Sequence, residues 1–231
     1  MNKKVFKKAL TACLPVISSF IVIGISFGVV VQSRGFGPLW AGAMSVFIYA
    51  GSMQFVALEL MTGGAGLLTV ALTTVMVNLR HVFYGLSMID QYKNVGKAKP
   101  YLIFALCDET YSLVCNPPAL APGEEKTFYL LVSVMNQISW VLGSILGGLL
   151  GAALPFSSQG IDFALTALFV SVVAEQWLST KEHTPALLGL GLSLLSLLLF
   201  GPENFLLPAM LLILLGLSLY RFGKGLSLIH I

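Results

Sequence analysis

The chain has 231 residues, of which 57% are hydrophobic and only 10% are charged, with a formal net charge of +3. A soluble globular domain carries about 25% charged residues. This composition argues against a cytosolic enzyme, a disordered tail or a nucleic-acid-binding protein, and it indicates a polytopic membrane protein in a lipid bilayer.

Five long stretches contain no Asp, Glu, Lys or Arg, at 9–33, 35–58, 60–79, 127–161 and 183–202. A helix needs about 20 apolar residues to cross a bilayer core. The strand-like alternation of a membrane barrel is absent from the sequence. We therefore predict an all-α transmembrane helix bundle that forms a single permease domain over 1–231. Its elements are expected near 10–32, 38–59, 61–89, 101–119, 128–155, 163–178, 185–200 and 203–220.

Three basic clusters predict the orientation of the chain. Lysines gather at 3–8 and at 93–99, and Arg221 and Lys224 lie in the tail. The positive-inside tendency places all three clusters in the cytoplasm, together with the N-terminus. However, three elements separate the first two clusters and five separate the last two. Either the tendency fails once, or one element in each half does not fully cross, which leaves about seven spans with broken or re-entrant helices.

Glycines mark the candidate breaks in these helices. For Gly51 and the glycines of 63–66, a broken helix and close helix packing are weighed evenly. For the glycines of 143–151 we favour close packing. The apolar run behind the first lysines lacks a cleavage site, so we interpret it as a retained span.

Motifs of catalysis and of cofactor binding are absent from the sequence. It contains no Walker A sequence, no Gly-x-Ser-x-Gly elbow and no His-Glu-x-x-His motif. Its three cysteines show no metal-ligand spacing and are expected to pack in the core. We therefore expect neither an enzyme nor a resident cofactor.

The first polar group inside a predicted span lies in the segment 78–85. At 100° per residue, Asn78, Arg80, His81 and Tyr84 share one face of a helix, and the apolar side chains of the segment take the other. Such a helix presents one side to lipid or core and one side to a polar cavity. The planar fork of Arg80 suits a carboxylate, and histidine titrates near neutral pH.

The second polar group is the segment 107–111. Asp108 and Glu109 lie eight to nine residues past Pro100, on the order of 12 Å along a helix. Tyr111 falls near the face of Asp108, whereas Glu109 points about 100° away. The two carboxylates therefore need different partners unless the helix breaks here.

A charge at the bilayer centre costs roughly 2.5–3.5 kcal/mol on insertion scales, so these groups need partners. We infer that Arg80 pairs with one of the two carboxylates. Three interpretations are open: an ion pair that only locks helices, side chains that reach water at the interface, and a substrate or proton site. We favour the site, because His81, Tyr84 and Tyr111 add hydrogen-bonding groups that a simple lock does not need.

Polar residues in neighbouring spans have weaker signals. Gln54 lies in a small, polar patch and is expected either to contact substrate or to bond to a neighbouring helix. Asn136, Gln137 and Trp140 are expected to make interhelical hydrogen bonds and packing contacts.

Six segments in order resemble the AzlC-type large subunit of bacterial branched-chain amino acid exporters. The most specific is Asn78-Leu79-Arg80-His81, followed by Tyr84-Gly85, which is similar to the family's Asn-x-Arg-His…Tyr-Gly signature. The others lie at 24–28, 49–55, 108–111, 140–143 and 160–169.

The resemblance implies a permease in the bacterial inner membrane that exports branched-chain amino acids, with methionine as a further substrate. It also implies coupling to protons and a small membrane partner of the AzlD type. The alternative is a channel, or a packing subunit of a complex that moves another small solute.

Overall fold

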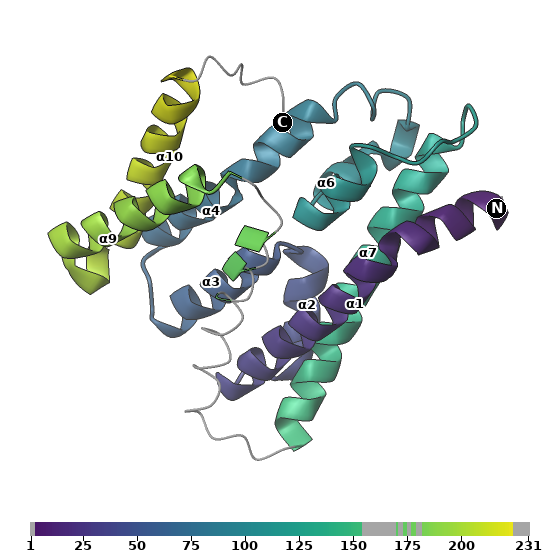
Figure 1. Cartoon of the computed structure of the whole chain (residues 1–231). Helices are drawn as coiled ribbons and strands as arrows, with labels where there is room; N and C mark the ends of the chain where they lie inside the picture. The colour runs from purple at the N-terminus through teal and green to yellow at the C-terminus, as the bar shows by residue number, and fades with distance from the viewer. Residues whose placement is uncertain (1–2, 154–169, 171–172, 175–176, 179–181, 224–231) are drawn as a thin grey trace. The chain divides into compact units, whose positions relative to one another are not determined.

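The computed structural model describes residues 3–153, 170, 173–174, 177–178 and 182–223 (Figure 1). Its described elements are all helical, which confirms the all-α class: α1 (Lys3–Ser33), α2 (Gly37–Phe47), α3 (Gly51–Thr62), α4 (Leu67–Ser87), the short 3-10 helix η1 (Gly96–Ala98), α5 (Lys99–Phe104), α6 (Asp108–Val114), α7 (Glu125–Ala153), α9 (Thr184–Asn204) and α10 (Leu206–Gly223). The predicted 163–178 element and the 160–169 segment fall almost wholly outside the described residues.

Four of the described helices are long and apolar enough to cross a membrane: Lys3–Ser33, Leu67–Ser87, Glu125–Ala153 and Thr184–Pro202. They confirm the predicted elements at 10–32, 61–89, 128–155 and 185–200 as helices of spanning length. The helix of the 61–89 element begins later than predicted, because α3 ends at Thr62 and a turn at 63–66 follows, in which Gly64 has a φ of 64°.

The other two predicted elements of the N-terminal part are interrupted helices. The 38–59 element is divided into α2 and α3 by residues 48–50, where Tyr49 has a φ of 44°. The 101–119 element is divided into α5 and α6 by residues 105–107. Each predicted span is thus two short helices joined at a bend.

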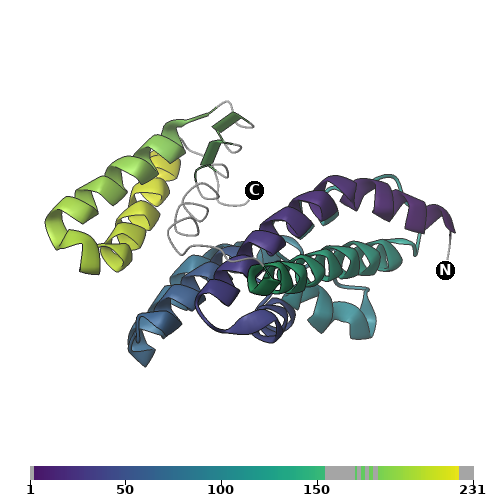
Figure 2. The ribbon, with the colours of Figure 1, turned by 90° about the horizontal axis from the view of Figure 1, so that it is seen from below.

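Helices α1 and α7 pack along one another in the same direction (Figure 2). A Cβ atom on Gly24 would lie 3.0 Å from the carbonyl oxygen of Trp140, and one on Gly28 would clash with the carbonyl of Ser144. From the other side, a Cβ on Gly147 would clash with the carbonyl of Ile25. Close packing, favoured for the glycines of 143–151, is therefore confirmed: they let two backbones approach more closely than any side chain would allow.

The first interrupted element starts and finishes at one end of the α1–α7 pair. At its start, Pro38 of α2 lies against Gly148 near the end of α7. At its finish, Glu59 of α3 forms an ion pair with Arg34, just past the end of α1, at 2.9 Å. The element therefore turns back without running the length of α7.

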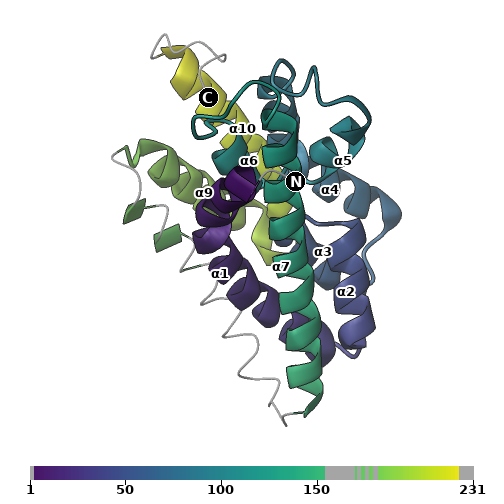
Figure 3. The same cartoon turned by 90° about the vertical axis from the view of Figure 1, so that its right-hand side faces the viewer.

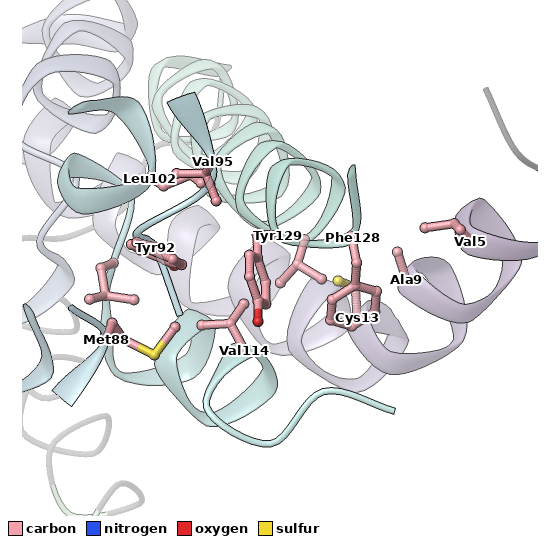
Figure 4. Close-up of a cluster of buried hydrophobic side chains, with 12 residues drawn as sticks. Val5, Ala9, Cys13, Met88, Tyr92, Val95, Leu102, Val114, Phe128 and Tyr129 are labelled. Atoms are coloured by element: carbon pink, nitrogen blue, oxygen red, sulfur yellow. The ribbon is translucent and has the colours of Figure 1, made fainter. Parts of the chain in front are cut away.

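The second interrupted element behaves in the same way at the opposite end. The Lys8 ammonium near the start of α1 donates to the carbonyl of Ala119, beyond α6, at 2.6 Å. Val5, Ala9 and Cys13 of α1 share one hydrophobic cluster with residues from the 88–95 turn, α5, α6 and the start of α7 (Figure 4). Figure 3 shows α5 and α6 toward the start of α7, and α2 toward its other end.

The bends of the two elements meet near the middle of α7. The Cys107 thiol donates to the Tyr49 hydroxyl at 3.9 Å, and the rings of Tyr49 and Phe104 lie 6.3 Å apart. At the same level Gln137 donates to the carbonyl of Val46 at 3.3 Å, and Asn136 donates to Thr110 at 3.2 Å. These contacts confirm the predicted interhelical role of both α7 residues.

This arrangement brings two lysine clusters to the same end of the α1–α7 pair. Helix α4 begins after α3 at one end of the α1–α7 pair, and it leads into Met88 and Tyr92, which belong to the same hydrophobic cluster as Val5 at the other end. Because the α2–α3 element returns to its starting end, residues 3–8 and 93–99 lie at the same end.

Residues 71–76 and the described residues from 170 onward form a second compact unit. Within it α9 and α10 pack together. The chain bends at Gly201, which has a φ of 72° and precedes Pro202, as the Gly-Pro pair suggests. Ser196 donates to the carbonyl of Phe205 across this bend at 2.8 Å.

We predict that Gly147→Ala destabilises the protein by about 1–3 kcal/mol, because its methyl group must displace the backbone of α1. Thermal unfolding of the detergent-purified protein measures the loss. Gly189→Ala in α9 is the matched control, since a Cβ there meets no atom within 4 Å. Equal melting temperatures for the two variants would contradict the close packing of α1 on α7.

Candidate functional site

The site begins with the two faces of α4. Val82, Phe83 and Leu86 are 55%, 43% and 58% exposed, respectively, and lie on the outward face. Asn78, Arg80, His81 and Tyr84 are all half-buried. The predicted division of this helix into an apolar and a polar face is therefore confirmed.

Arg80 joins the two interrupted helices. Its Nη1 atom forms an ion pair with Oδ2 of Asp108 at 2.6 Å, and its Nη2 atom donates to Oγ of Ser52 at 2.6 Å. Asp108 is the first residue of α6, and Ser52 is the second residue of α3. The inferred pairing of Arg80 with one of the two carboxylates is thus confirmed, and the partner is Asp108.

The break before α6 explains why Arg80 pairs with Asp108. Cys107 is extended, with φ −96° and ψ 177°, so Asp108 stands at the start of a new helix and faces α4. A carboxylate in the first turn of a helix is also stabilised by the backbone N–H groups there. Both conditions hold the Asp108 carboxylate in place for Arg80.

The ion pair does not use all the hydrogen-bonding atoms of its two side chains. Within the part of the chain that the structure describes, the buried atoms Arg80 Nε, Asp108 Oδ1 and Asn78 Oδ1 have no hydrogen-bond partner. The side chains of Arg80 and Asp108 are nevertheless 40% and 36% exposed, so the pair is open on one side. One hydrogen-bond donor and two hydrogen-bond acceptors therefore remain available for a small polar ligand.

An aromatic group lies next to the ion pair. The rings of Tyr84 and Tyr111 stack with centroids 4.6 Å apart, and His81 meets Tyr84 edge to face at 5.9 Å. Ser87 donates to the Tyr111 hydroxyl at 3.0 Å. His81 Nδ1 lies 3.2 Å from the carbonyl of Asn78. The structure thus brings the predicted residues of α4 and α6 together.

Gln54 belongs to a separate, fully buried network. It donates to Ser45 at 3.2 Å and accepts from the indole N–H of Trp140 at 2.8 Å. Ser45 in turn donates to Ser144 at 2.7 Å. Of the two roles predicted for Gln54, these bonds match the interhelical one, and Trp140 has the expected role as well.

Two residues of the site were not predicted. Ser52 bonds to Arg80, and Tyr49 joins the two bends. Ser52 could have been suspected, because a serine directly after Gly51 suits the first turn of a helix. Tyr49 carried no such signal, since a left-handed backbone is unusual for tyrosine.

Metal ligands are not grouped in this region. Among the residues the structure describes, no three His, Cys, Asp or Glu side chains lie together in a way that could hold a metal ion. The groups that do meet here are a guanidinium, a carboxylate and a serine hydroxyl, which suit the non-covalent binding of a charged or dipolar solute.

These features define a multi-pass membrane protein with an internal polar site on interrupted helices. The chain belongs to the AzlC family: the family model described as AzlC protein matches residues 15–154. This confirms the resemblance seen in the sequence, and it places the chain in a transporter family and not in an enzyme family.

Three relatives illustrate the match. The chain is 41% identical over 226 residues to the branched-chain amino acid transport protein AzlC of Bacillus subtilis, which covers 96% of this chain and 89% of that protein. It is 41% identical to an uncharacterized membrane protein of Haemophilus influenzae, over 86% of this chain and 82% of that protein. It is 31% identical to the inner membrane protein YgaZ of Escherichia coli, over 68% and 67% of the two chains. No solved structure matches the chain.

Proposed function

We propose that this chain is the large subunit of a secondary transporter that exports branched-chain amino acids across the bacterial inner membrane. The observation that carries the proposal is the Arg80–Asp108 pair, which lies where two interrupted helices meet and keeps a buried donor and a buried acceptor unused. The name of the Bacillus subtilis relative supports this substrate class, and that of YgaZ supports the inner membrane.

The α-carboxylate of the substrate binds at Arg80 and the start of α3. The first turn of α3 holds no acidic residue, and no side chain caps it. The N–H groups of this turn carry partial positive charge, and Ser52 brings the Arg80 guanidinium next to them. An anion placed between them relieves the repulsion between these positive groups and gives Arg80 Nε an acceptor.

The α-ammonium group binds on the Asp108 side. Asp108 Oδ1 and Asn78 Oδ1 are acceptors without donors, and an ammonium group offers three N–H bonds. A zwitterionic amino acid therefore satisfies the leftover groups of both charges at once. Glu109 is the second carboxylate at this position and remains a candidate for the same role.

The side chain of the substrate is recognised only by apolar contact. One methylene in an apolar pocket changes binding by about 1–3 kcal/mol. Discrimination among valine, leucine and isoleucine is therefore weak, and methionine is accepted too.

Protons drive the export step in this proposal. Asp108, Glu109 and His81 lie in the first turn of α6 or on the polar face of α4, so they can exchange protons while the site is open. Protonation from outside releases the amino acid and resets the carrier. A small AzlD-type membrane subunit completes the transporter.

The membrane topology follows from the two interrupted elements. Helices α1, α4 and α7 cross the membrane. The α2–α3 element enters and leaves on the outer side, and the α5–α6 element enters and leaves on the cytoplasmic side. The N-terminus and residues 93–99 then both face the cytoplasm, as the positive-inside tendency requires. Up to residue 153 the proposed topology therefore has three crossings and two re-entrant elements.

Export is tested by feeding cells a valine- or leucine-containing dipeptide and measuring the internal amino acid pool. Cells with the chain and its AzlD-type partner should hold a lower pool than cells lacking either one. Arg80→Lys should slow export roughly 10- to 100-fold, because it loses one charge-assisted hydrogen bond worth about 1.5–3 kcal/mol.

The matched control is Arg34→Lys, in the ion pair with Glu59 at the end of α1. It should export at nearly the normal rate while both variants insert equally well. Normal export by Arg80→Lys would exclude Arg80 as the carboxylate-binding group. An unchanged pool in cells with the complete transporter would refute the function itself.

Proton coupling is tested by Asp108→Asn in proteoliposomes that contain both subunits. An amide cannot bind or release a proton near neutral pH, so we expect flux that no longer responds to a pH gradient. Glu59→Gln, at the end of α3, should keep the response of the unmodified chain. A full response in both Asp108→Asn and Glu109→Gln would remove these carboxylates from the proton step.

The topology is tested with a membrane-impermeant maleimide on intact cells, using a chain whose own three cysteines are replaced. Thr62→Cys, at the end of α3, should react from outside, and Lys97→Cys only after the membrane is opened. If α2–α3 crossed the membrane completely, the two positions would exchange their behaviour.

A further inference from the structure

The first turns of α1 carry two different faces. Val5, Ala9 and Cys13 are buried in the hydrophobic cluster of Figure 4. Lys4, Lys7 and Lys8 lie on another face of the helix, and their side chains are exposed. Spacing of three and four residues brings these three lysines together.

The three lysines form one wall of a cavity of about 670 Å³. The opposite wall consists of Ser112 and Leu113 of α6 and Asn116 of the turn that follows. Among the residues that the structure describes, no acidic side chain lines this cavity, and most of its surface is apolar. It thus combines three positive charges with a mostly apolar lining.

We propose that this cavity binds the headgroup of an anionic phospholipid such as phosphatidylglycerol. The phosphate contacts Lys4, Lys7 and the amide group of Asn116, and the start of the acyl chains lies against Leu113. The cavity sits at the lysine-bearing end of α1, a helix apolar enough to cross the bilayer, which is where lipid phosphates lie. A freely soluble anion would make no contacts with the apolar part of the lining.

Lys8 has a different role from Lys4 and Lys7. Its ammonium donates to the carbonyl of Ala119 at 2.6 Å and so ties the turn after α6 to α1. Lys4 and Lys7 are therefore the positions at which a change tests the lipid without cutting this tie.

A bound lipid has a consequence for the fold. It bridges α1 and α6, and Asp108 lies one turn before Ser112 on the same short helix. Occupancy of the cavity therefore holds α6 in the position at which Asp108 meets Arg80. The binding inference itself does not depend on the transport proposal.

The test is a titration of the detergent-purified, delipidated protein with phosphatidylglycerol, followed by thermal unfolding and native mass spectrometry. We expect the lipid to raise the melting temperature and to remain bound in the gas phase. The double variant Lys4→Gln/Lys7→Gln should need more than about tenfold more lipid, since each lysine near anionic lipid contributes roughly fivefold. Asn116→Ala, on the opposite wall, is an independent variant and should lose affinity severalfold.

The control is Lys93→Gln/Lys97→Gln, which removes the same charge from the same end of the protein and should bind normally. Equal weakening of both double variants would overturn the site, because it would show attraction to basic charge in general. Equal binding of phosphatidylcholine with the same acyl chains would also overturn it. So would equally tight binding of soluble glycerol 3-phosphate, which would show an anion site without a lipid.

Discussion

Interrupted helices can exist inside a membrane only where protein groups satisfy the broken backbone, because lipid offers no hydrogen bonds. Here the middle of α7 supplies those groups. Gln137 donates to the carbonyl of Val46 at the end of α2, and Asn136 donates to Thr110 in α6. The glycines that bring α7 against α1 fix this polar segment in place. Both bends therefore depend on a contact between two long helices that carry no part of the candidate site.

The two polar networks differ in how completely their polar groups are hydrogen-bonded. Around Gln54 the side-chain oxygen and nitrogen both have partners, and the network is buried from Ser45 to Trp140. Around Arg80 the ion pair is partly open, and buried atoms on both partners lack hydrogen bonds. A buried polar group without a partner costs about 1–3 kcal/mol. A pure helix lock gains nothing from that cost, whereas a binding site recovers it when its ligand arrives.

The positions of the charged residues, and the free-energy cost of placing charges inside a membrane, predicted much of this architecture from the sequence. The lysines at 3–8 and 93–99 left two possibilities, a failure of the positive-inside tendency or an element that does not fully cross. The free-energy cost of isolated charges inside a membrane predicted a partner for Arg80. The candidate breaks at Gly51 and at 63–66 lie beside or on the observed breaks at 48–50 and 63–66, but the other break was not predictable. Residues 105–107 contain neither glycine nor proline, and the break at 48–50 is centred on Tyr49. These breaks are set by tertiary contacts, such as the one between Tyr49 and Cys107, and not by local preference.

Scarcity of charge makes the position of each charged residue informative in this protein. Lysines gather at one end of α1, and the Arg34–Glu59 pair closes the other end. Between these ends the long faces of α4 and α7 are apolar, as the exposed Val82 and Leu142 show. Among the described residues, Arg80, Asp108 and Glu109 are the exceptions, and all three lie at the level where the helices break. In the proposed function, this is the level at which the zwitterionic substrate binds.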